Sequence, residues 1–271
     1  MNYVFNKTER GYHHIKNHIV CEDFSSSYTD HERMIISCAD GHGGAKYIRS
    51  QHGSKFAVQT VNNCFSKIRY KDLIGNIDKI SEKIKLNILC DWNAKVEWDI
   101  SNRPFRKFEF DGLSDEDSFD ILTNRIKAYG TTLVGALVIK DKVVIVGIGD
   151  TEVIGVKNGE IVKLFDDKDD PAGNITYSMC QEDAYKYLKI KIINKNELDM
   201  VLICTDGLSG PYQSYTNFKE SFILPCIKKI LESQSVTYID EFVTELATSK
   251  GNGDDVSLAF ILFDNTKKKY Y

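Results

Sequence analysis

Short apolar runs that end beside an aspartate recur along this sequence. The run 34–39 leads into Asp40-Gly41, and the run 200–204 leads through Thr205 into Asp206-Gly207. A third run, 256–263, begins directly after Asp254-Asp255. Apolar runs of four to eight residues are typical of buried strands. Carboxylates fixed at the ends of rigid strands can meet at one site although they are far apart in the sequence.

The remaining pattern alternates strands with helices. Apolar residues recur at helical spacing over 56–65 and again over 73–88. Further strands are predicted at 132–139, 143–148 and 152–156, with a hairpin turn at Lys140-Asp141-Lys142 and another at Asn158-Gly159. Helices are expected around 218–223, with Pro225 as a break or kink, and over 242–247, ending near Gly251. Residues 99–120 lack a period and are expected to form a surface loop.

This order favours an α+β fold. Hairpin-connected strands with helices inserted between them indicate antiparallel sheets covered by helices, and argue against a doubly wound parallel sheet. No internal repeat or low-complexity linker divides the chain. We therefore expect a single domain over residues 1–271.

Composition narrows the class of protein. The net charge of −4 and the isoelectric point near 5.9 argue against a general nucleic-acid binder. The seven cysteines form no C-x-x-C pair, which suits reduced thiols. The N-terminus lacks a signal-peptide core, and the longest apolar stretch, 131–149, is interrupted by the charged turn at 140–142. We expect a soluble cytoplasmic protein with neither a nucleic-acid nor a membrane partner.

The aspartates at the strand ends predict a metal centre. Carboxylate oxygens select Mg²⁺ or Mn²⁺ over zinc, and a glycine beside a ligand lets its backbone carbonyl approach an ion. A single Asp-Gly pair more often marks a turn, but three such features beside buried strands favour the site. All six histidines lie within the first 52 residues and match no common zinc spacing. The acidic run 166–171 lacks the glycine and glutamate of an EF-hand.

The ordered motifs resemble those of type 2C metal-dependent protein phosphatases. They are Asp40-Gly41-His42-Gly43-Gly44, Gly130-Thr131-Thr132, Gly149-Asp150-Thr151, Thr205-Asp206-Gly207-Leu208 and Asp254-Asp255-Val256-Ser257, preceded by Glu22-Asp23. The resemblance covers residues 10–263. The leader Gly11-Tyr12-His13-His14, its continuation to Asp23, and Asn174-Ile175-Thr176-Tyr177 are closer to the bacterial-type branch.

The resemblance implies a fold, a reaction and a site. It implies a central antiparallel β-sandwich flanked by helices on both sides, with the metal centre at one edge. The implied reaction is hydrolysis of phosphoserine and phosphothreonine esters in a phosphorylated protein, such as the target of a cognate kinase, by a water that bridges two Mg²⁺ or Mn²⁺ ions. The implied metal ligands are Asp40, the Gly41 carbonyl, Asp206, Asp254, Glu22 and Asp23. The implied catalytic residues are His42, Asp40 and Glu22, with His42 as general acid and Glu22 acting on the water. Residues 157–197 would form the variable flap beside the cleft.

Two positions depart from the family pattern. An arginine that grips the substrate phosphate often stands four residues before the glutamate, where this chain has His18. Arg10 and Lys16 are the nearby candidates to replace it. An aspartate that helps to bind a third metal is replaced by Gly210, so Asp150 is left without its usual companion. We therefore expect two ions.

Two alternatives to an enzyme remain at this point. The chain could be a catalytically weak phosphatase-like module that binds or regulates a phosphoprotein, or an unrelated metal-binding protein with chance motifs. Loss of metal aspartates would mark the silent module, but Asp40, Asp206 and Asp254 are all present. The ordered set of motifs argues against chance.

Overall fold

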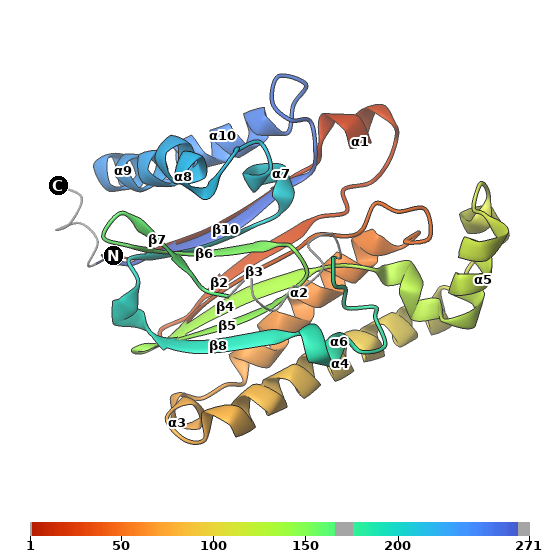
Figure 1. The fold of residues 1–271 in the computed structure, drawn as a ribbon, viewed down its shortest axis with the longest axis horizontal. Helices are drawn as coiled ribbons and strands as arrows, with labels where there is room; N and C mark the ends of the chain where they lie inside the picture. Colours follow the sequence, from red (N-terminus) through yellow and green to blue (C-terminus); the bar gives the residue numbers. More distant parts are fainter. Residues whose placement is uncertain (1, 166–175, 265–271) are drawn as a thin grey trace.

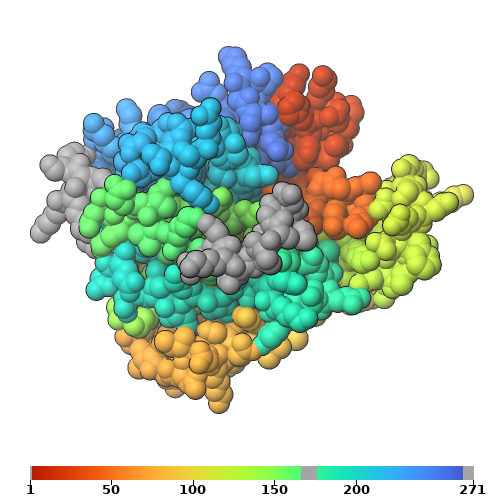
Figure 2. All heavy atoms as spheres, in the orientation of Figure 1, coloured from red at the N-terminus to blue at the C-terminus, as the bar shows by residue number. Residues whose placement is uncertain are grey.

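Two five-stranded antiparallel sheets face each other, and helices cover the outer side of each (Figure 1). The computed structural model describes residues 2–165 and 176–264. The acidic run 166–171, Asn174 and Ile175 lie outside the described residues. Figure 2 shows the same layers in space-filling form, with the blue C-terminal helices above the sheets and the gold helical segment below them. The expected α+β sandwich is confirmed.

Each sheet joins strands from distant parts of the chain. The first has the order β1-β10-β9-β6-β7, from Tyr3–Glu9, Val256–Leu262, Met200–Cys204, Glu152–Lys157 and Glu160–Lys163. The second has the order β2-β3-β4-β5-β8, from Phe24–Thr29, Arg33–Ala39, Leu133–Ile139, Lys142–Ile148 and Lys189–Asn194. The five strands predicted in β3, β4, β5, β6 and β9 therefore form, as does β10.

Alternation along the strands divides the core into three layers. In β3, Ile36 and Cys38 face the other sheet, while Ile35 faces the helices. In β10, Ala259 belongs to the layer between the sheets and Phe260 to the layer under the C-terminal helices. Successive side chains of a strand point to opposite faces, so strands buried on both faces read as continuous apolar runs.

Two helices cover the second sheet. α2 (Ser50–Ser66) places the predicted stripe with Ala57, Val61 and Phe65 in the buried cluster. α4 (Ile77–Asn102) is longer than expected and begins later than residue 73. Leu73 instead ends the short α3 (Tyr70–Leu73). α4 begins after Asn76, whose side chain caps the helix by accepting a hydrogen bond from the Lys79 amide.

Helices over the first sheet come from the C-terminal third. α8 (Tyr215–Phe218) continues through a π-helical turn, η5 (Lys219–Ile223), into α9 (Leu224–Ser233). Pro225 lies in the first turn of α9, where its missing amide hydrogen is tolerated, and the predicted irregularity falls in the turn just before it. α10 (Thr237–Leu246) agrees with the helix expected near 242–247.

The expectation that residues 99–120 form a surface loop was wrong. α4 continues to Asn102, and η1 (Lys107–Phe110) and α5 (Asp115–Thr123) follow it. The acidic triplet 115–117 forms the first turn of α5, where negative charge complements the helix dipole. Ser114 caps that turn through the Asp117 amide, a signal that the sequence contained.

The remaining helical elements are short. They are α1 (Tyr12–Lys16), η2 (Arg125–Tyr129), α6 (Ala184–Tyr187), η4 (Lys195–Glu197) and α7 (Asp206–Ser209). Both predicted hairpin turns are confirmed, since Lys140 and Asn158 have φ values of 54° and 51°. Among the described residues, no helix has the length and apolar character needed to span a bilayer.

Candidate metal centre

Seven carboxylates from five separate segments line one cavity of about 510 Å³. The described part of its lining contains no lysine and no arginine. The carboxylates are those of Glu22, Asp23, Asp40, Asp150, Asp206, Asp254 and Asp255. The strand ends therefore bring together the aspartates that the sequence singled out, at one edge of the two sheets.

Asp40 is held through its backbone at the end of β3. Its amide donates a hydrogen bond to Thr132 Oγ1 at 2.9 Å. Its carbonyl accepts hydrogen bonds from the Thr132 amide at 2.8 Å and from Thr131 Oγ1 at 2.9 Å. These bonds give Thr131 and Thr132 a supporting role at the site. The Asp40 carboxylate is thus fixed at its root while its side chain faces the cavity.

Glu22 lies against the glycine that follows Asp40. The Gly41 amide donates to the Glu22 carbonyl at 3.1 Å, and a Cβ atom on residue 41 would lie 2.7 Å from that carbonyl oxygen. Only glycine allows this approach. Two hydroxyls at the start of α2 also hold Glu22, because Ser50 donates to its carboxylate and Ser54 to its carbonyl.

Asp206 and Asp23 meet at the end of β9. Asp206 opens α7 directly after Thr205, whose hydroxyl donates to Asp23 Oδ2 at 2.7 Å. Asp23 is only 5% exposed. Asp254 lies across the cavity, where its Oδ1 accepts a hydrogen bond from the Asp255 amide at 2.9 Å. The first four ligand positions expected from the sequence therefore share this cavity with Glu22 and Asp23.

Sequence reasoning did not find the role of Asp255. Its carboxylate is 5% exposed and accepts hydrogen bonds from the amides of Gly11 and Glu22, both at 2.7 Å. His14 Nδ1 lies 2.9 Å from the same carboxylate. Asp255 therefore joins the N-terminal leader to the loop before β10. The pair Asp254-Asp255 was the only signal for it in the sequence.

Burial and mutual repulsion raise the pKa of several of these acids. Burial raises the pKa of Asp40 well above its ordinary value, and the charges of Asp23 and Asp206 raise it further. Burial, followed by the charge of Asp254, raises the pKa of Asp206. Burial likewise raises the pKa of Asp23 and of Glu22. An acid with a raised pKa is one whose charged form lacks compensation.

A divalent cation fits this donor set. Clustered carboxylate oxygens are the ligands of hard cations, and bound positive charge would offset the repulsion. Among the described residues, no three His, Cys, Asp or Glu side chains already have the spacing of a metal site. Asp40 and Asp206 are instead hydrogen-bonded to each other. Hydrogen bonds to Asp40 and Glu22 therefore hold the backbone of the site in place.

His42 lines the same cavity. Its amide donates to the Gly130 carbonyl at 3.1 Å, and its ring packs on Tyr47 with centroids 4.8 Å apart. A Cβ atom on residue 130 would lie 2.3 Å from the Tyr47 ring, so glycine is needed there. Burial lowers the pKa of His42.

The expected replacements for the arginine do not line the cavity. His18 is exposed and has a φ of 59°. Lys16 is also exposed, at the end of α1. The Arg10 guanidinium donates to the His14 carbonyl at 3.1 Å. Of these N-terminal residues only His14 is part of the lining.

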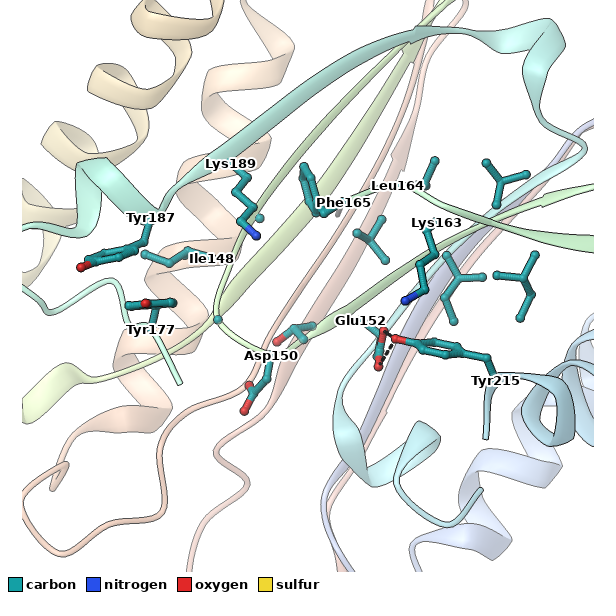
Figure 3. A pocket seen from close by; sticks show the side chains of 17 residues that line it. Ile148, Asp150, Glu152, Lys163, Leu164, Phe165, Tyr177, Tyr187, Lys189 and Tyr215 are labelled. Carbon is teal, nitrogen blue, oxygen red and sulfur yellow. Dashed lines mark hydrogen bonds between the residues drawn. The ribbon is translucent and has the colours of Figure 1, made fainter. Parts of the chain in front are cut away.

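A second pocket, of about 390 Å³, adjoins the acidic cavity (Figure 3). Asp150 lines both. The Tyr177 and Tyr187 rings stack at one end, 3.7 Å apart, and the Tyr215 hydroxyl donates to Glu152 at the other. The rest of its lining mixes apolar side chains with two lysines, and includes Ile148, Val153, Ile154, Ile161, Leu164, Phe165, Lys163 and Lys189.

Comparison with known proteins gives a family and a fold. The family model described as Protein phosphatase 2C matches residues 10–242. No curated protein sequence matches the chain. Among solved structures, a bacterial serine phosphatase is 18% identical with a TM-score of 0.61, covering 97% of this chain and 98% of that one.

Two further solved structures have the same fold. The serine/threonine phosphatase Stp1 of Staphylococcus aureus is 17% identical with a TM-score of 0.59, covering 97% of this chain and 96% of that one. The catalytic domain of the serine/threonine phosphatase PstP, solved with two manganese ions, is 18% identical with a TM-score of 0.55. That match covers 96% of this chain and 97% of the PstP chain.

Proposed function

Because the chain belongs to the protein phosphatase 2C family, we propose that its acidic cavity removes phosphate from phosphoserine and phosphothreonine residues of a protein. Membership makes the chain a metal-dependent protein phosphatase. The observation that carries the proposal is the convergence of seven carboxylates on one cavity without a lysine or arginine in its described lining. Such a cavity would repel a phosphate ester unless cations were bound in it.

Two Mg²⁺ or Mn²⁺ ions are the proposed cofactors. The structure of PstP contains two manganese ions, and carboxylate and carbonyl oxygens suit either metal. Asp40 and the Gly41 carbonyl would hold one ion, and Asp206 and Asp254 the other, with Asp40 shared between them. Bound ions would act as Lewis acids toward the phosphate and promote ionisation of the attacking water.

The chain's own residues would handle the protons. Ser50 holds one oxygen of the Glu22 carboxylate, and the raised pKa of Glu22 suits a group that accepts a proton from the attacking water. Asp23 is buried in the cavity wall and accepts a hydrogen bond from Thr205, which favours a supporting role there. His42 would protonate the leaving oxygen. Its lowered pKa makes the imidazolium a stronger acid but reduces its population at neutral pH.

The adjoining pocket offers room for the polypeptide of the substrate. Asp150 and Glu152 balance Lys163 and Lys189 in charge, and apolar and aromatic side chains share the walls with these four residues. We place there a side chain that neighbours the phosphorylated residue, with a preference for an apolar one. A small aryl phosphate would not use this pocket.

Hydrolysis of p-nitrophenyl phosphate and of a phosphothreonine peptide tests the function. We expect turnover of both substrates with Mn²⁺ or Mg²⁺ and its abolition by EDTA. The Asp40→Asn variant should lose nearly all turnover while remaining folded by circular dichroism. A folded protein that binds the phosphopeptide but turns over neither substrate with either ion would instead be a phosphatase-like binding module.

A further inference from the structure

This chain has His18 at the position of the arginine that grips the substrate phosphate in the family pattern. The family pattern points to His18, but the chain forms the short helix α1 before that position, and His18 ends exposed beyond it. His14, four residues earlier, lines the acidic cavity. Together with His42 it is one of two side chains in the described lining that can carry positive charge.

Asp255 fixes the orientation of the His14 ring. Backbone amides of Gly11 and Glu22 hold both Asp255 oxygens at 2.7 Å, so this carboxylate has little freedom to turn. His14 Nδ1 lies 2.9 Å from Asp255 Oδ2, an ion-pair contact. Nδ1 is buried and has no aligned hydrogen-bond partner among the described residues. Because Nδ1 lies beside the Asp255 carboxylate, the other ring nitrogen, Nε2, points away from it.

The other ring nitrogen faces the cavity. His14 Nε2 is 3.9 Å from Glu22 Oε2, beyond hydrogen-bond distance, so this contact does not occupy it. The Arg10 guanidinium also holds this residue, by donating a hydrogen bond to the His14 backbone carbonyl. The result is a nitrogen donor held at the cavity wall next to Glu22, on the side of the N-terminal leader.

From this geometry we propose that His14 binds a phosphate oxygen of the substrate through Nε2, with Asp255 as the residue that positions it. The inference rests on the proposed function. It assigns to the ring the binding of phosphate, since Arg10, Lys16 and His18 do not line the cavity. A charge-assisted hydrogen bond to phosphate is stronger than a neutral one, so the loss should be measurable in phosphate affinity.

The test compares His14→Ala, His14→Gln and the matched control His18→Ala in the full chain loaded with Mn²⁺. The readouts are the KM for p-nitrophenyl phosphate, the inhibition constant of inorganic phosphate, and Mn²⁺ affinity by calorimetry. For His14→Ala we expect the KM and the inhibition constant to rise about tenfold or more, as for loss of a charged hydrogen bond. His14→Gln keeps a donor and should fall between, while His18→Ala should match wild type.

Several outcomes separate this inference from the proposed function. Unchanged phosphate inhibition in His14→Ala, or an equal loss in His18→Ala, would overturn it. A tenfold loss of Mn²⁺ affinity in His14→Ala would also overturn it, because the histidine would then act through the metal ligands. If wild type has no turnover, the proposed function fails. Calorimetric binding of phosphate to the Mn²⁺-loaded variants would still decide the role of His14.

Discussion

Neutralising Asp40 should stabilise the metal-free protein and destabilise the metal-loaded one relative to wild type. Asp40 is surrounded by the charges of Asp23, Asp206, Asp150 and Asp254, and burial adds to their effect. Asp40→Asn removes one charge from this cluster and keeps the size of the side chain. The same change removes the carboxylate that the proposed site shares between two ions.

The size of the cavity sets the magnitude. A sphere of the cavity's volume would be about 10 Å across, and unit charges on opposite walls would repel by about 0.4 kcal/mol in water. At an effective dielectric constant of about 20 the same pair repels by about 1.7 kcal/mol. Four neighbours at this distance therefore repel Asp40 by about 1.7 kcal/mol in water. We expect metal-free Asp40→Asn to be more stable by about 1–2 kcal/mol, roughly 2–8 °C in Tm for a chain of this size.

Bound metal should make wild type more stable than Asp40→Asn, the reverse of the order expected without metal. A ligand at 100 times its Kd adds about 2.7 kcal/mol to the free energy of unfolding. Wild type should therefore gain roughly 5–10 °C with saturating Mn²⁺, and Asp40→Asn should gain much less. Thermal unfolding followed by circular dichroism, in EDTA and in Mn²⁺, measures both effects.

The control is Glu82→Gln, which removes a carboxylate charge from an exposed position on α4. It should change Tm little in either buffer. If Asp40→Asn is less stable than wild type in EDTA, repulsion among the cavity carboxylates does not destabilise the metal-free protein. If both proteins gain equally from Mn²⁺, Asp40 is not a metal ligand.

Three further predictions concern other parts of the chain. Asp99→Asn leaves the buried guanidinium of Arg49 without one partner, and urea unfolding at pH 7 should show a loss of about 3–5 kcal/mol. Hydrogen bonds and nearby positive charge lower the pKa of Asp99, so the wild-type advantage should be complete above about pH 5 and shrink as the pH falls toward the folded-state pKa. Ser50→Ala removes the hydroxyl that holds Glu22 and should lower kcat about two- to tenfold at unchanged Tm. Of the seven thiols Cys90 is the exposed one, so a thiol reagent should modify it first in the native protein, as peptide mapping would show.

Local sequence patterns predicted several of the residues that line the cavity. Asp40, Asp206 and Asp254 were found because each lies within two residues of a buried strand, and strand ends are fixed by the sheet rather than by the loop. Apolar runs predicted those strands because both faces of each sheet are covered. The family resemblance supplied Glu22 and His42, which lie in irregular segments that periodicity does not describe.

The missed features depend on contacts between distant residues. Asp99 reads as a polar residue at the start of a loop, yet it is fully buried because Arg49 and Tyr129 reach it from other segments. α1 has five residues, too few for a helical period to be visible. Its formation moves His18 out to the surface and places His14 at the cavity, which a count of residues before Glu22 cannot reveal.

The cavity combines a fixed frame with side chains that repel one another. Hydrogen bonds hold the backbone of Asp40 and Glu22, and two amides hold the Asp255 carboxylate. The negative charges of Asp40 and Asp206 are not offset by nearby positive charge in the described part of the chain, and burial and mutual repulsion raise the pKa of both acids. A site built in this way loses little order when empty and gains stability when cations enter. Metal affinity would then come from relief of repulsion as much as from new bonds, which is why neutralising a single aspartate should affect stability and turnover in opposite directions.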